Sequence, residues 1–174
     1  MKTWTAISLL NKARLPLKQK AVYLKKAIRR LDLKFTKDQL LAANLSPLDT
    51  ALLSKKHGID MNIRDIVRYT NRVWSTDEFV SLARLLPPNF ADVDDSFQFV
   101  ADKVDVMRQV HMKVTVSEIM TPKRFGYELV SYTSFLTERP TLEQITAFTR
   151  ASKGAACFGN ACLKFGYPLS FERM

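Results

Sequence analysis

The chain has 174 residues, of which 47% are hydrophobic and 25% are charged, and its net charge is +10. This balance is typical of a folded globular protein, since intrinsically disordered chains lack so much apolar sequence. The sequence has two cysteines and no apolar run near the roughly 18 residues of a membrane span, which argues against a disulfide scaffold and an integral membrane protein.

The length suits a single domain over residues 1–174. No Gly/Ser-rich or Pro-rich stretch resembles a linker, and we find no internal repeat in the sequence. The first apolar run is short and is followed by Lys12 and Arg14, the reverse of the order in a secretory signal. We therefore expect an intracellular, cytoplasmic protein.

The positive charge is concentrated in a strongly basic N-terminal segment, residues 1–37. This segment holds 11 Lys and Arg residues against the single Asp32, whereas residues 38–174 hold 16 basic and 16 acidic residues. Solubility alone does not require such a concentration, but a local surface that binds a polyanion does.

A helix is predicted within this segment. Pro16 suits the first helical position, and apolar residues follow it at steps of four and three, which is the pattern of one buried face. The cations that project away from this face are Lys18, Lys25, Lys26, Arg29 and Arg30, with Lys20 flanking the apolar seam. Phosphate backbones, anionic lipid and acidic proteins are all candidate partners for such a helix.

Further helices are predicted in chain order over 36–43, 46–57, 62–73, 75–86, 94–112, 121–136, 141–153 and 157–165. Three pairs have the spacing of a capping box, which marks a helix start: Thr36 with Gln39, Ser75 with Glu78, and Thr141 with Gln144. Residues 112–117 alternate apolar and polar like a strand. Because no partner strand is evident, we interpret them as helix or connector. The fold class is all-α: a compact single-domain bundle of eight to nine short capped helices, with at most a short extended piece near 112–117.

Residues 37–57 have the shape of a helix-turn-helix motif. In that motif the N-terminal side chains of the second helix reach base edges. Here those side chains would be Asp49, Thr50 and Ser54, with Lys55 and Lys56 available for phosphate. The acidic Asp49 argues against a base reader, and short turns between helices are common in any helical protein.

Three arginines, Arg64, Arg68 and Arg72, form a row at helical spacing. They can track successive phosphates by bidentate contacts. They can equally pair within the fold with the acidic stretch at Asp92, Asp94 and Asp95.

No catalytic or metal-binding pattern stands out. His57 and His111 lack zinc-site neighbours, and Cys157 and Cys162 lack the spacing of a structural zinc site. An EF-hand loop from Asp92 would lack its glycine and its bidentate glutamate. We therefore expect no metal, no cofactor and no enzymatic activity.

The sequence favours a non-enzymatic nucleic-acid-binding protein, a regulator or accessory factor for DNA or RNA. The residues expected at its interface are Lys18, Lys20, Lys25, Lys26, Arg29, Arg30, Arg64, Arg68, Arg72, Lys55 and Lys56. Tyr23, Phe35, Tyr69 and Trp74 lie near basic residues, and each is either a stacking platform or part of the core. The alternative is a protein-interaction module (an adaptor, inhibitor or chaperone) whose basic helix docks on an acidic protein.

Overall fold

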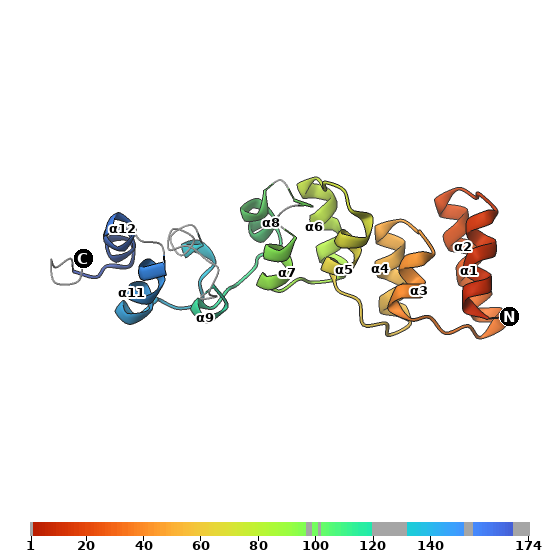
Figure 1. Ribbon diagram of the computed structural model, residues 1–174, viewed down its shortest axis with the longest axis horizontal. Coiled ribbons are helices and arrows are strands. Elements are labelled where there is room, and N and C mark those ends of the chain that lie inside the picture. Colours follow the sequence, from red (N-terminus) through yellow and green to blue (C-terminus); the bar gives the residue numbers. More distant parts are fainter. Residues whose placement is uncertain (1, 97–98, 101, 120–131, 152–154, 169–174) are drawn as a thin grey trace. The chain divides into compact units, whose positions relative to one another are not determined.

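A computed structural model describes residues 2–96, 99–100, 102–119, 132–151 and 155–168 (Figure 1). The prediction of an all-α fold is confirmed, although the described residues form eleven α-helices rather than eight or nine. Two compact units, Met1–Val106 and Met107–Met174, make up the structure, and each is described here by itself. The single-domain organisation stays a prediction.

Unit 1 contains α1 (Thr3–Lys12), α2 (Leu17–Leu31), α3 (Lys37–Ala42), α4 (Pro47–Lys56), α5 (Ile63–Thr70), α6 (Thr76–Leu85) and α7 (Phe90–Asp95). Helix α8 (Lys103–Gln109) continues from unit 1 into unit 2. Unit 2 then contains α9 (Val116–Ile119), the 3-10 turn η2 (Thr133–Phe135), α11 (Leu142–Ala151) and α12 (Ala155–Phe165).

One capping device begins six of these helices. A side-chain oxygen of the N-cap residue accepts the backbone N–H three residues later, and that later side chain accepts the N–H of the N-cap residue. Ser75 begins α6 in this way. The other five N-cap residues are Thr36, Asn62, Asn89, Thr115 and Thr141, which begin α3, α5, α7, α9 and α11. Successive members of these five are 26, 27, 26 and 26 positions apart.

An aliphatic residue directly follows each of these five evenly spaced capping boxes and is almost completely buried. These residues are Leu40, Ile66, Val93, Ile119 and Ile145, none more than 2% exposed. A regular period of this length, with the same cap and the same core position, is the mark of a helical repeat. The expectation of no internal repeat is therefore wrong. We call the segments that begin at the five N-cap residues repeats 1 to 5.

In unit 1, successive helix pairs pack side by side. Helix α1 contacts both its partner α2 and the first helix of the next pair, α3, and α5 likewise contacts α7. The second helices α4 and α6 also pack directly against each other. The amide of Asn11 adds a hydrogen bond of 3.0 Å to the carbonyl oxygen of Ala42.

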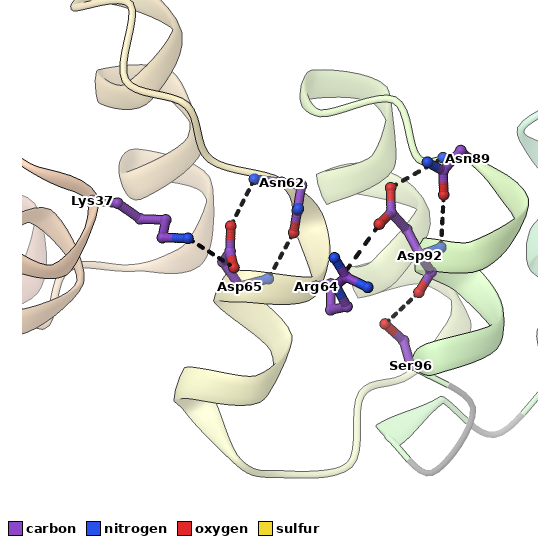
Figure 2. A network of polar contacts seen from close by, with 7 residues as sticks. All are labelled: Lys37, Asn62, Arg64, Asp65, Asn89, Asp92 and Ser96. Carbon is purple, nitrogen blue, oxygen red and sulfur yellow. Dashed lines mark hydrogen bonds and ion pairs between the residues drawn. The ribbon is translucent and has the colours of Figure 1, made fainter.

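Ionic contacts link the capping boxes of neighbouring repeats (Figure 2). The Asp65 carboxylate accepts the Asn62 N–H and also binds Lys37 of the preceding repeat, with 3.4 Å between Nζ and Oδ1. The Asp92 carboxylate accepts the Asn89 N–H in the same way. Arg64 of the preceding repeat approaches it, with Nε 4.0 Å from Oδ1. Each carboxylate therefore caps its own helix and holds the previous repeat.

Two predicted segments differ from the structure. The single helix expected over 94–112 is wrong, because α7 ends at Asp95 and α8 begins at Lys103. Between them, Val100 forms an isolated parallel bridge with Trp74, and the backbone N–H of Trp74 donates to the Phe99 carbonyl oxygen. In unit 2, Val114 forms a similar bridge with Leu136 before α9 begins. Most of the helix predicted over 121–136 lies outside the described residues.

Candidate nucleic-acid interface

Helix α2 carries most of the predicted interface and docks through the expected face. Ala21, Leu24 and Ile28 are buried, whereas Leu17 and Leu31 at the two ends are about half exposed. Its exposed cations are Lys18, Lys25, Lys26, Arg29 and Arg30. Lys20 differs from them, because it is only 7% exposed and burial lowers the pKa of its ammonium group. A phosphate therefore reaches the other lysines of α2 more readily than Lys20.

A cleft of about 1030 Å³ opens beside α2 in unit 1. Its walls are the C-terminal half of α2, the connection 32–36 and the C-terminal end of α4 with the turn that follows. Six cations line it: Lys25, Lys26, Arg29, Lys34, Lys37 and Lys56. Only two carboxylates, those of Asp32 and Asp60, lie among them. We call this site the basic cleft; its excess of positive charge suits an anionic ligand.

The repeat explains why the two connections meet at one site. The segments 32–35 and 57–61 each run from a second helix to the next capping box, so they follow the same edge of unit 1 (Figure 1). Each leaves its helix by a left-handed residue, Asp32 with φ 48° after α2 and Gly58 with φ 63° just after α4. Residues distant in the sequence are thereby brought to a common cleft.

The chemistry of α2 explains why the cleft stays open. Helix α6, which packs on α4, carries Phe79, Val80 and Leu82, all buried. Helix α2 lines the cleft mainly with Lys25, Lys26 and Arg29. Charged groups resist burial without partners, so a helix side made of them does not close onto its neighbour.

The other predicted cations lie elsewhere. Lys18, Arg30 and Lys55 are exposed but do not line the basic cleft. The structure thus brings together four of the predicted residues, Lys25, Lys26, Arg29 and Lys56. It adds Lys34, Lys37 and His57, none of which the sequence placed at the interface, and it includes Phe35, which the sequence named as a stacking platform or part of the core. The period of the capping boxes is the signal that could have found them.

The arginine row is partly engaged within the fold. Arg64 pairs with Asp92, as the alternative interpretation of the row proposed. Arg72 binds Glu78, with 2.9 Å between Nη1 and Oε2, and its guanidinium lies 4.4 Å from the centre of the Trp74 ring. Hydrogen bonding from Arg72 holds the pKa of Glu78 below its ordinary value. Arg68 is exposed on α5, the helix of Arg64, whereas Arg72 lies beyond the end of that helix.

The helix-turn-helix interpretation does not fit the burial of α4. Thr50 is 4% exposed and Ser54 is 1% exposed, and both hydroxyls donate to backbone carbonyl oxygens of α4 or its N-cap. Asp49 accepts a hydrogen bond from the Ser46 hydroxyl at 2.9 Å. The side chains expected to read bases are therefore used inside the fold.

Two further features bear on other classes of site. Across the part of the chain that the structure describes, no three His, Cys, Asp or Glu side chains gather in an arrangement that could hold a metal ion. No helix in that same part combines the length and apolar character of a membrane span.

No protein-family model matches the chain, and comparisons with curated proteins and with solved structures find no match.

Proposed function

We propose that this protein binds nucleic acid through its phosphate backbone, and that the basic cleft is the binding site. The observation that supports the proposal is the gathering of six cations, from three separate segments, around one cleft. Lys and Arg side chains that neutralise phosphates release condensed counterions, and this release supplies most of the affinity of non-specific binding.

A structural role accounts for only part of this charge. Cations in the last turn of a helix are stabilised by its dipole, which explains Arg29 in α2 and Lys56 in α4. Lys25, Lys26 and Lys34 lie outside those last turns. Lys37 lies in the first turn of α3, where the dipole opposes it, and its structural role is the ion pair with Asp65. The charge of Lys25, Lys26 and Lys34 therefore exceeds what helix stability requires.

The test is fluorescence anisotropy with labelled RNA and DNA over a series of salt concentrations. Binding through the cleft predicts a log–log salt slope of up to about −3.5, because five cations besides the paired Lys37 line it and each phosphate contact contributes about 0.7 in a single strand. The variant K25Q/R29Q removes two cations from the cleft. The matched control K18Q/R30Q removes two cations from the same helix outside it.

The proposal expects K25Q/R29Q to weaken binding at least tenfold and to reduce the slope by about 1.4, while K18Q/R30Q stays close to the native chain. Equal losses in both variants would mean that general charge, and not the cleft, attracts the nucleic acid. An absence of binding to RNA and DNA at low salt would contradict the proposal altogether.

An acidic protein is the second candidate partner. Val22 and Tyr23 are 48% and 50% exposed on α2 beside the cations, and such apolar groups anchor protein interfaces. The ring of Tyr23 also lies 5.9 Å from the Lys26 ammonium nitrogen. A protein partner would lose affinity on V22S/Y23S and would respond less steeply to salt than a nucleic acid.

A further inference from the structure

We infer that the basic cleft accepts a single strand of nucleic acid in preference to a duplex, with unpaired bases against its apolar residues. This inference rests on the proposed function and concerns the form of the ligand. Three observations carry it: the concave shape of the site, the cations on more than one of its segments, and the apolar residues in the same lining.

The shape of the cleft suits a flexible strand. Its cations stand on α2, on the connection 32–36 and at the end of α4, around a concave space of about 1030 Å³. A duplex is stiff over roughly 150 base pairs and presents its phosphates on a convex surface. It therefore meets the rim of such a site but not its interior. A single strand bends into the space and brings successive phosphates to opposite walls.

Apolar residues also line the cleft, which favours exposed bases. Besides the cations, the lining includes Ile28, Leu33, Phe35 and Ile59. Phe35 is partly exposed, and it lies in the connection that also carries Lys34. A duplex keeps its bases stacked inside, whereas a single strand offers their faces to aromatic and apolar side chains. Alternating cations and an aromatic ring form the usual platform for single-stranded nucleic acid.

This arrangement also assigns different roles to two sets of side chains. Lys25, Arg29 and Lys56 hold phosphates, so their loss changes both the affinity and its salt dependence. Phe35 contacts a base, so its loss changes affinity without changing the number of counterions released. A purely electrostatic surface would not show this division.

The experiment measures the anisotropy of a labelled 12-nucleotide single strand and of its 12-base-pair duplex, both as RNA and as DNA, at one fixed salt concentration. The variant F35L keeps apolar bulk in the connection and removes only the aromatic ring. R29Q removes one phosphate contact, and far-UV circular dichroism with the thermal midpoint verifies that both variants fold.

The inference expects the single strand to bind at least tenfold tighter than the duplex, in the RNA arm, the DNA arm or both. F35L should lower single-strand affinity about fivefold or more with an unchanged salt slope, whereas R29Q should lower the slope by about 0.7. Duplex binding that equals or exceeds single-strand binding would overturn the inference and leave the proposed function standing. If F35L binds the single strand like the native chain, the base-contacting role of Phe35 is wrong. If neither form binds, both proposals fail.

Discussion

Lys56 at the end of α4 and Arg29 at the end of α2 line the same cleft, although they belong to different helix pairs. Their meeting depends on the connections that follow each second helix, since both run along one edge of unit 1. Lys55, the neighbour of Lys56, is exposed but lies outside the lining. A comparison of these two adjacent lysines therefore distinguishes the effect of a position in the cleft from the effect of charge alone.

We predict that K56Q lowers nucleic-acid affinity about threefold to tenfold and reduces the salt slope by about 0.7 to 0.9. K55Q removes the same charge from the same helical turn, outside the cleft, and should change affinity less than twofold. Anisotropy titrations of the two variants side by side provide the measurement. Equal effects would show that the cleft has no special part in binding.

Asp92 should be important for stability but not for binding. Its carboxylate caps α7 through the Asn89 N–H and pairs with Arg64, and the residue is 7% exposed. D92A leaves both groups without this acceptor, so we expect a loss of about 2 kcal/mol in the free energy of unfolding. D92N can still accept the capping hydrogen bond and should lose about half as much.

Urea denaturation measures these differences, with the exposed Asp38→Ala as the reference. In the binding assay, R64Q should stay within twofold of the native chain because Arg64 already holds a carboxylate. A loss as large as that of R29Q would place Arg64 in the interface instead.

Lys20 should act against stability without contributing to binding. Its burial disfavours the charged form and lowers its pKa below the ordinary 10.5. The native state is therefore penalised while the lysine is charged, and the free energy of unfolding increases as the pH rises through the lowered pKa. K20M keeps the length of the side chain and removes this penalty.

We therefore expect K20M to raise the thermal midpoint at pH 7 and to leave nucleic-acid affinity within twofold. The gain in midpoint should shrink as the pH rises through the lowered pKa toward 10.5, because the folded lysine loses its charge over that range and with it the penalty. A marked loss of affinity would mean that the Lys20 ammonium group reaches the ligand.

Much of unit 1 could be predicted from the sequence, because local signals and tertiary packing agree there. The capping boxes at Thr36 and Ser75, together with the buried face around Leu24, gave the right helices. Thr115 with Glu118 carries the same signal, but it lies inside a stretch of alternating residues that resembles a strand. The 26-residue period requires both this box and the one at Asn89, which lies outside the helix predicted from residue 94.

The candidate site was harder to predict than the helices. Helical periodicity predicts which side chains project away from the buried face of α2. It does not predict that Lys34 and Lys56 line the same cleft as those side chains. That meeting is a property of how two connections fold back along one edge. The break in the helix predicted over 94–112 has a similar origin, since the bridge between Trp74 and Val100 is a tertiary contact that overrides local helical spacing.

The ion pair between Glu78 and Arg72 should make the free energy of unfolding depend on pH. The hydrogen bond from Arg72 lowers its pKa below the ordinary 4.5, so the pair stabilises the folded chain above about pH 4.5 and this contribution is lost as the pH falls through the lowered value. E78Q keeps the capping box and removes the charge. Because both side chains are about half exposed, the native chain should exceed E78Q by less than about 1 kcal/mol at pH 7.

Urea unfolding at pH 7 and at pH 3 measures this difference. It should shrink toward zero at the lower pH and also at high salt. A difference that stays constant with pH would assign the effect to the shape of the side chain instead of to the ion pair.

The most direct test of the basic cleft is lysine footprinting, in which acetic anhydride labels the protein with and without saturating single-stranded oligonucleotide and mass spectrometry reads each lysine. The account predicts that Lys25, Lys26, Lys34 and Lys56 are protected several-fold, while Lys18 and Lys55 react equally in both samples. Protection that spares the cleft lysines, or that covers Lys18 and Lys55 to the same degree, would contradict it.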